Sequence, residues 1–452
     1  MPIGMRGTRR SHTPPSLDST ETAPANTERA RGRHGTWPAH DLGCRNVTAV
    51  STNDLGPAPA NQRAVRRHNL GVVLRHVAER GPCSRAAIAL QTGLNKTTVS
   101  SLVAELIEFG LVRETEAEQR GTVGRPALPL ELSGHRVVGL GLEIGVDYLA
   151  ARATDVGGAA RHRALVQGDN RGRPVDEVLD ELWQLAQETL AALAAAGLMT
   201  AGAVVALPGL VDSAGALLVA PNLGWTDVPV SGRLAERLGG SSFPVRADNE
   251  ANLGALAELW EGAGRELGDF LYVSGELGVG AGIVVGGELF RGAHGFSGEL
   301  GHVTVDPEGE LCACGSRGCV ETRVALGALL RAAGIEEPAG VEDLAQRARA
   351  GDGRTLDALA AAGRWLGVGV AGAVNLLNPQ GVVVGGYFAT LAPWLIPGIE
   401  QELDARVLAS HWDGTRVLTS VLGAEAAVRG AAALALRRVF ADPGVVAELA
   451  AR

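Results

Sequence analysis

Residues 298–321, "GELGHVTVDPEGELCACGSRGCVE", contain three of the five cysteines of the chain together with one histidine. His302, Cys312, Cys314 and Cys319 follow the spacing H-x9-C-x-C-x4-C. Three thiolates and one imidazole make a closed tetrahedral ligand set, which is typical of a structural rather than a catalytic zinc ion. Glycines between the last two cysteines permit the tight turns that such a site requires. The spacing therefore predicts a structural Zn²⁺ in this stretch.

Two other interpretations of the cluster stay open, a Cys312–Cys319 disulfide and inert buried thiols. Five cysteines are too few and too unevenly spaced for a disulfide scaffold, and no signal-peptide layout precedes them. We therefore expect a cytoplasmic protein. The longest weakly polar run, residues 190–207, is interpreted as a helix end, a turn at Gly197 and a buried strand, with no membrane span.

Composition and charge divide the 452-residue chain into three regions. Residues 1–58 are rich in Ser, Thr, Pro and Gly, and we expect a disordered tail there. Residues 61–132 carry 10 basic and 7 acidic side chains, and residues 1–60 carry 7 and 5, so the remainder has a net charge of −9 − 3 − 2 = −14. A basic front on an acidic body indicates that a polyanion binds at the front.

The second region, 59–132, has the helical periodicity of three short helices. Leu70, Val73, Leu74 and Val77 share one face of the first. Ser84 is expected to cap a short helix that ends at Gly93. Asn95 is expected to cap the third, whose predicted buried stripe is Val99, Leu102, Val103, Leu106 and Ile107. This layout is typical of a helix-turn-helix, in which the N-terminal residues of the last helix contact DNA.

A hairpin with Gly121 and Gly124 at its turn is predicted to follow the third helix and to form a wing. Lys96, the single lysine of the chain, stands at the start of the third helix. A small helical packing module that does not contact DNA is the alternative. The residues predicted to contact double-stranded DNA are Arg85, Lys96, Thr97, Thr98, Ser100, Ser101 and Arg125.

The third region, 133–452, alternates β-rich and Ala-rich helical segments, which predicts an α/β fold. Four stretches of the chain together carry a resemblance to a known family. They are the β-hairpin "VVGLGLEIGVDYLAARATDVGG" (137–158), the "DNEAN" loop (248–252), the "GELGH" motif with the cysteines, and "GRP" (124–126) after a helix-turn-helix. Over about residues 59–440 the chain resembles the ROK family of repressors, open reading frames and kinases. The resemblance implies a winged helix-turn-helix followed by a two-lobed, actin-like ATPase (sugar-kinase-like) domain. The lobes are expected at about 135–248 plus the C-terminal helix, and at about 249–428.

The same resemblance implies the site residues. Members of the family carry zinc on the four ligands named above. Carboxylates beside the zinc-bound imidazole accept hydrogen bonds from vicinal sugar hydroxyls. The implied sugar-binding residues are Gly209, Asn222, Asn249, Glu250, Glu299, His302 and Glu321.

Three departures from the family's kinases argue against catalysis. The first phosphate turn is Glu143-Ile144-Gly145-Val146-Asp147, the second phosphate loop is Glu276-Leu277-Gly278, and Glu250 replaces the usual Asp base. We therefore expect no enzyme activity and no catalytic residues, but a sugar-responsive repressor of carbohydrate-metabolism genes. It should bind an operator as a homodimer or a dimer of dimers. An active sugar kinase with a DNA-binding head, and an assembly protein with a vestigial pocket, are the alternatives.

Overall fold

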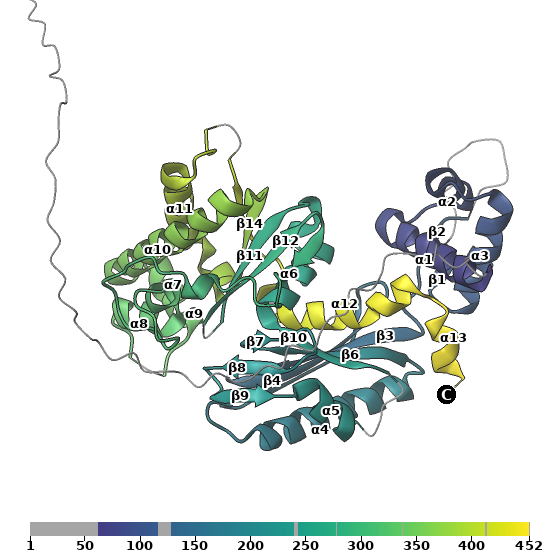
Figure 1. The fold of residues 1–452 in the computed structure, drawn as a ribbon, viewed down its shortest axis with the longest axis horizontal. Coiled ribbons are helices and arrows are strands. Elements are labelled where there is room, and N and C mark those ends of the chain that lie inside the picture. The colour runs from purple at the N-terminus through teal and green to yellow at the C-terminus, as the bar shows by residue number, and fades with distance from the viewer. Residues whose placement is uncertain are drawn as a thin grey trace, which may run out of the picture. The chain divides into compact units, whose positions relative to one another are not determined.

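The computed structural model describes residues 62–115, 128–238, 243–276, 278–336, 338–411 and 414–451. The tail predicted at 1–58 lies outside these ranges. The described residues form a head of three helices and an antiparallel pair of strands, which we call the DNA head after its predicted role, and a body with two five-stranded sheets (Figure 1).

The DNA head consists of helices α1 (Gln62–Arg80), α2 (Arg85–Thr92) and α3 (Lys96–Glu108), with strands β1 (Val112–Glu114) and β2 (Leu130–Leu132) paired antiparallel. Both predicted caps are confirmed. The Ser84 hydroxyl accepts a hydrogen bond from the Ala87 amide at 3.2 Å, and the Asn95 side chain accepts one from the Thr98 amide at 2.7 Å.

One residue of the predicted buried stripe of α3 is misplaced. Val99, Leu102, Val103 and Leu106 are buried, but Ile107 is 36% exposed. Ile107 directly follows Leu106, so it lies about 100° further round the helix, beyond the edge of the buried face. The prediction of a buried Ile107 was therefore wrong.

The first sheet of the body has the strand order β10-β6-β3-β4-β5. Strands β3 (Val137–Ile144), β4 (Tyr148–Asp155) and β5 (Ala160–Gln167) are antiparallel neighbours, whereas β6 (Met199–Leu207) and β10 (Val245–Asn249) run parallel to β3. Helices α4 (Val175–Ala195) and α5 (Val230–Arg237) cover one face and α12 (Ala426–Ala441) the other (Figure 1). A small sheet of β7 (Leu210–Val211), β8 (Leu217–Ala220) and β9 (Trp225–Val228) adjoins it. We call this part lobe I.

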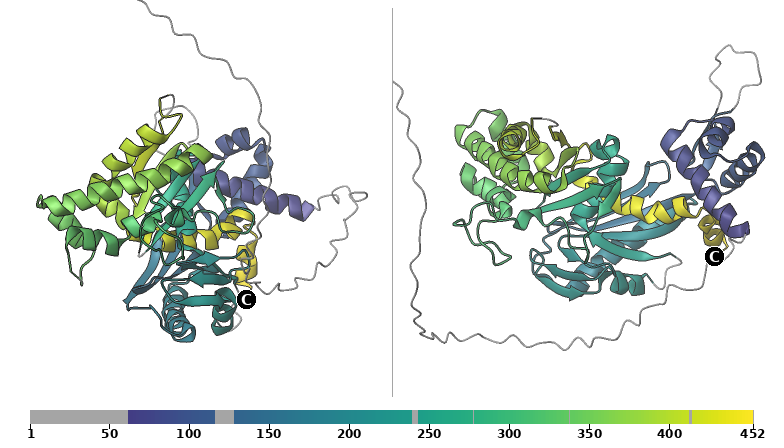
Figure 2. Two further views of the ribbon diagram at one scale, coloured as in Figure 1. Left: turned by 60° about the vertical axis from the view of Figure 1, so that its left-hand side comes forward. Right: turned by 45° about the horizontal axis from the view of Figure 1, so that its top comes forward.

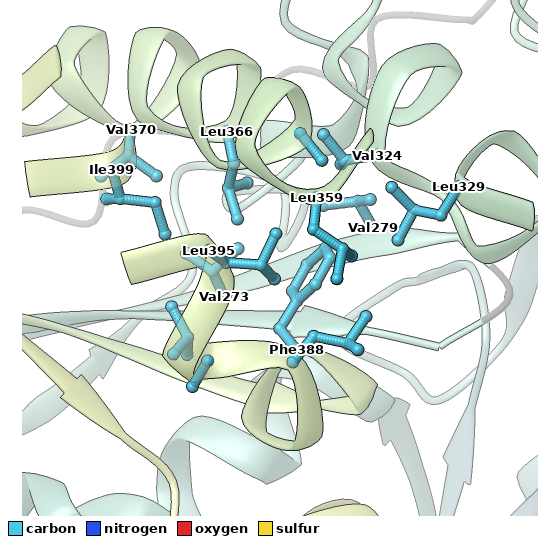
Figure 3. Packing of buried hydrophobic residues seen from close by; sticks show 14 of the residues in the cluster. Val273, Val279, Val324, Leu329, Leu359, Leu366, Val370, Phe388, Leu395 and Ile399 are labelled. Carbon is cyan, nitrogen blue, oxygen red and sulfur yellow. The ribbon is translucent and has the colours of Figure 1, made fainter. Parts of the chain in front are cut away.

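The second sheet, with order β13-β12-β11-β14-β15, belongs to what we call lobe II. Its core is the largest apolar cluster, in which Phe388 packs among aliphatic side chains of the sheet and of the long helices (Figure 3). Its strands are β11 (Phe270–Gly275), β12 (Val279–Val285), β13 (Glu288–Phe290), β14 (Gly381–Gly386) and β15 (Arg416–Thr419). Its helices are α7 (Val320–Val324), α8 (Leu326–Ala333), α9 (Val341–Arg349), α10 (Gly353–Leu377) and α11 (Tyr387–Arg406).

Helix α6 (Glu250–Trp260) lies between the two lobes. It packs against α12 on lobe I and against β11 and β12 on lobe II. Three 3-10 helices (Ala263–Glu266, Leu300–His302 and Gly423–Glu425) and a terminal helix, α13 (Val445–Ala450), complete the described elements. The loop before α6 is therefore held from both lobes.

One helix in the described part of the chain, α10, is long and apolar enough to cross a membrane by length and composition. Half of its most apolar window is buried, and it packs along α11 in the core of lobe II. A core helix meets the same criterion. Residues 190–207, by contrast, form the end of α4, a turn with φ +72° at Gly197 and strand β6, as the sequence predicts.

Candidate functional site

A cavity lies where loops of both lobes meet, and every residue that the sequence assigned to sugar binding lines it. Lobe I contributes the turns after β6 and β8. Lobe II contributes the start of β12 and residues 298–321, which contain the predicted zinc ligands. Among the residues that the structure describes, no lysine or arginine lines the cavity. The lining residues are Pro208, Gly209, Pro221, Asn222, Asn249, Glu250, Gly278, Val279, Gly280, Ala281, Gly298, Glu299, His302, Ala313, Cys314 and Glu321.

Asn249 fixes the lobe I side of the cavity. Its side-chain oxygen accepts hydrogen bonds from the amides of Ala251 at 2.9 Å and Asn252 at 3.1 Å, so it caps α6. Its side-chain nitrogen donates to the Gly209 carbonyl at 2.9 Å. Gly209 has φ +140°, and a Cβ there would lie 2.3 Å from the Val219 carbonyl oxygen. These contacts place Glu250 at the first turn of α6, facing the cavity.

Glu321 and Gly278 form the lobe II side. The Glu321 carboxylate accepts a hydrogen bond from the Val279 amide at 2.9 Å. A Cβ at Gly278 would lie 2.5 Å from that carboxylate and 3.4 Å from the Asn222 amide nitrogen. Glycine at 278 therefore lets groups from both lobes share the cavity. The sequence analysis singled out Gly278 only as part of a segment that departs from the phosphate-binding loop of the family's kinases. It did not predict this close approach.

The ligand atoms of His302, Cys312, Cys314 and Cys319 all lie within 4.8 Å of one another. His302 Nδ1 is 3.7 Å from Cys312 Sγ, and Cys314 Sγ is 3.7 Å from Cys319 Sγ. The other ring nitrogen, Nε2, is 4.0 Å from Glu299 Oε2. One imidazole therefore faces the thiols with one nitrogen and a cavity carboxylate with the other. This group can hold a metal ion. Cys83 lies apart from it, in the DNA head.

Two further buried carboxyl groups, those of Glu143 and Glu276, interact electrostatically with Glu250. Glu143, at the end of β3, is 2% exposed, and Tyr148 Oη donates to its Oε1 at 2.7 Å, while its Oε2 has no partner. Burial raises the pKa of Glu143 to about 8, with the charges of Glu250 and Glu425 adding to the effect against the Tyr148 hydrogen bond. Burial also raises the pKa of Glu250 to about 7. We call Glu143, Glu250 and Glu276 the acidic cluster.

Glu276 completes the acidic cluster from the lobe II side. Burial, together with the charges of Glu250, Glu143 and Asp147, raises its pKa well above the usual range. No lysine or arginine contributes to these pKa values, so no positive charge offsets the effect of burial on the three carboxyl groups. At neutral pH the acidic cluster therefore retains protons, and it presents no positive charge to an anion.

An ion pair that sequence reasoning missed ties the end of strand β10 to lobe II. The two terminal nitrogens of Arg291, just after β13, donate to both carboxylate oxygens of Asp248 at 3.0 and 2.5 Å. Asp248 is 6% exposed. Bidentate pairs of this type fix geometry as well as charge. No spacing signal marks this pair, since 43 positions separate its members.

The residues predicted to contact DNA divide into free and engaged groups. Lys96, Thr97 and Ser100 are exposed at the start of α3, although the Ser100 hydroxyl donates to the Lys96 carbonyl at 2.9 Å within the helix, and Thr98 is half-buried. Two others already have partners, because Arg85 pairs with Glu114 at 2.6 Å and Ser101 Oγ accepts from Arg66 at 3.0 Å. Arg125 lies outside the described residues. The exposed first turn of α3 is thus the part of this set that can meet DNA without rearrangement.

Comparison with known proteins identifies the class. The ROK family model matches residues 139–438, about two thirds of the chain, and the MarR family model matches residues 72–121. The chain belongs to the ROK family. The MarR-like winged helix before the ROK domain defines a DNA-binding transcriptional regulator of that family.

Individual relatives agree with this class. A putative xylose repressor of Caldicellulosiruptor sp. (strain Rt8B.4) is 32% identical over 405 residues, covering 85% of this chain and all of that protein. The xylose repressor of Bacillus subtilis (strain 168) is 31% identical, covering 83% and 97%. A ROK family transcriptional regulator, a homologue of the Escherichia coli MLC protein, superposes with TM-score 0.70 at 27% identity, covering 85% and 98%. The ROK glucokinase of Streptomyces griseus, in complex with glucose and AMPPNP, has TM-score 0.58 at 28% identity over 66% of this chain and 99% of its own.

The buried Glu143 predicts a pH-dependent stability. Its folded-state pKa, about 8, is above the ordinary value of 4.5, so between these values the folded protein holds a proton that the unfolded chain has released. Stability should therefore fall as pH rises from about 4.5 to 8. Glu143→Gln removes the ionisable group. The difference in melting temperature, variant minus wild type, should therefore be a few degrees more positive at pH 8.5 than at pH 5.5.

The exposed Glu236→Gln serves as the control, because it removes one carboxylate without a buried partner. Thermal unfolding of the three proteins at both pH values measures the effect. An equal offset between Glu143→Gln and the wild type at pH 5.5 and 8.5 would contradict the prediction.

Proposed function

We propose that this protein is a sugar-responsive repressor of carbohydrate-metabolism genes. The cavity carries the proposal, because carboxylate and amide groups line it without any lysine or arginine. Such acceptors suit the vicinal hydroxyls of a neutral sugar, and they oppose a phosphate group. The winged helix supplies the DNA contact, and ligand binding changes the DNA affinity of the protein.

We further propose an unphosphorylated aldose as the effector, with D-xylose as the first candidate. The near full-length similarity to proteins named xylose repressors supports this choice. Asn249, Glu250, Glu299 and Glu321 are the proposed partners of its hydroxyls, with His302 donating from Nε2. Gly209 and Asn222 shape the wall on the lobe I side.

We propose that His302, Cys312, Cys314 and Cys319 bind one structural Zn²⁺. In a tetrahedral site with Zn–S bonds of about 2.3 Å, neighbouring sulfurs are about 3.8 Å apart. The separation of 3.7 Å between the sulfurs of Cys314 and Cys319 agrees with that geometry. The metal would hold the imidazole in one orientation, so that its second nitrogen stays at the cavity.

The zinc proposal predicts a linked loss. Cys314→Ser should lower the zinc content from one per chain toward zero and weaken D-xylose binding at least about tenfold, the range seen when metal surroundings are disturbed. Cys83→Ser is the matched control, because Cys83 lies away from the cavity and should keep both properties. Elemental analysis and calorimetric titration measure the two. A metal-free wild type that still binds the sugar would contradict this role.

We propose that the protein does not transfer phosphate. The acidic cluster supports this, because Glu143, Glu250 and Glu276 present no positive charge to the phosphates of a triphosphate. An active sugar kinase remains the second candidate function, favoured by the match to the ROK glucokinase.

One experiment separates the two functions. A thermal-shift panel of D-xylose, D-glucose and their phosphates should give a rise in melting temperature for a free sugar alone. With that sugar and Mg-ATP, sugar phosphate should not accumulate. The same sugar should change the affinity for an operator duplex selected by the protein from a random pool. Turnover near ordinary kinase rates, about 1–100 per second, would instead support the kinase.

We propose that the exposed start of α3 enters the major groove, and that a symmetric oligomer in the cytoplasm binds paired half-sites. Lys96, Thr97, Thr98 and Ser100 are the proposed contacts on α3, with Ser101 and Arg85 joining after their present partners are exchanged. Arg125 of the predicted wing is proposed for the minor groove.

Lys96 is the sharpest test of this surface, because an ammonium group at a helix N-terminus suits a phosphate. Lys96→Ala should weaken binding to all duplexes alike and lower the salt slope of binding by about one unit. If Lys96 reads guanine instead, the loss should be about 1–3 kcal/mol on the operator alone. Titrations that overlay the wild type at two salt concentrations would remove Lys96 from the interface. Glu108→Ala, at the far end of the same helix, provides a control.

A further inference from the structure

The DNA head packs directly on the body through a shared apolar core. Leu70 and Leu74 of α1 belong to the same buried cluster as Leu436 and Val439 of α12. The two helices lie side by side in all the views (Figures 1 and 2). The end of α12 is therefore a part of the seat on which the DNA head rests.

Gly71 marks the closest approach of α1 to α12. A Cβ at Gly71 would lie 2.7 Å from the carbonyl oxygen of Ala441 and 3.0 Å from that of Phe440. Arg75 Nη1 donates to the Phe440 carbonyl at 3.0 Å, and Arg67 pairs with Asp442 at 3.1 Å. The last carbonyls of a helix lack partners within the helix and carry its negative end. Two arginines about two turns apart on α1, one on either side of Gly71, thus hold the C-terminal end of α12.

The other end of α12 reaches the cleft. A Cβ at Gly141, two residues before Glu143 on β3, would lie 2.2 Å from the carbonyl oxygen of Val428, so the first turn of α12 lies against the strand that carries Glu143. A Cβ at Gly430 would lie only 1.9 Å from the carbonyl oxygen of Leu253 in α6. Leu253 is one turn from Glu250, which lines the cavity. One helix of 16 residues therefore contacts cavity elements at its start and the DNA head at its end.

We infer that α12 transmits ligand binding from the cavity to the DNA head, with Gly71 as a positioning residue for that head. The inference rests on the proposed function. A sugar that contacts Asn249 and Glu250 shifts α6 relative to lobe I, and α6 cannot move along Gly430 without moving α12. A packed helix moves as a unit, so its C-terminal carbonyls carry the displacement to α1.

Gly71→Ala tests the inference, because it adds one methyl group at the seat and nothing at either binding site. Alanine favours a helix over glycine by about 1 kcal/mol, so the substitution does not weaken α1 itself. The matched control is Gly372→Ala in α10, where a Cβ meets nothing within 4 Å. Arg75→Met is the second variant, because it removes the hydrogen bond to Phe440 without adding bulk to the helix contact.

The measurement is the ratio of operator Kd values with and without saturating D-xylose, alongside sugar affinity, zinc content and thermal unfolding. Allosteric ratios are usually about 5- to 150-fold. The wild type and Gly372→Ala should share one ratio. Gly71→Ala and Arg75→Met should bind the sugar normally but reduce the ratio toward one.

The possible outcomes distinguish a failure of the proposed function from a failure of the inference about α12. A wild type whose DNA binding ignores every sugar of the panel overturns the proposed function, and this inference with it. A sugar-responsive wild type whose ratio is unchanged in folded Gly71→Ala and Arg75→Met overturns the inference alone. If Gly71→Ala does not fold, the ratio of Arg75→Met decides in the same way.

Discussion

The direct contact between strand β3 and helix α12 is the constraint on which the rest of the structure depends. A Cβ at Gly139 would lie 2.1 Å from the Ala432 carbonyl oxygen, and one at Gly141 would lie 2.2 Å from that of Val428. Only glycine at both positions lets the helix lie on the strand backbone. Because α12 is seated this deeply, it can meet α6 on one side and α1 beyond the edge of the sheet. Lobe I, the cavity loop and the DNA head thus share a single support.

The charge arrangement of the cleft follows from the same packing. β3 delivers Glu143 to the first turn of α12, while α6 delivers Glu250 and the loop after β11 delivers Glu276. Burial and acidic neighbours raise the pKa values of these groups, and no lysine or arginine lowers them. In contrast, Asp248 forms an ion pair with Arg291. This pair holds the end of strand β10 but places no positive charge beside the acidic cluster. Carboxyl groups that are buried and partly protonated can both donate to and accept from hydroxyl groups, which is the hydrogen-bonding versatility that a sugar needs.

Local chemistry could be predicted from the sequence, but long-range packing could not. Ser84, Asn95 and Gly197 were correctly placed because caps and turns depend on a few neighbouring residues. The cavity residues and the four-residue metal group were suggested by motifs whose spacing is a local property, and their chemical roles stay predictions. Ile107 failed because periodicity does not state how wide the buried face is. The Arg85–Glu114 pair, the Asp248–Arg291 pair and the depth of Glu143 each depend on segments distant in the chain, for which no local signal exists.

The seating of the DNA head explains why a kinase-like body suits a regulator. In a two-lobed fold the ligand draws loops of both lobes together, and the strain appears at the elements that both lobes share. Here α6 is that element, and its neighbour α12 ends at α1 rather than at solvent. A kinase uses the closure of its lobes to assemble a phosphate site, which needs positive or polar groups where this chain has Glu143 and Glu276. If the chain holds no phosphate, as we propose, the same closure would leave its free energy available for displacing the head. The glycine at position 71 gives that displacement a backbone-to-backbone contact, and such a contact transmits small shifts because no flexible side chain intervenes.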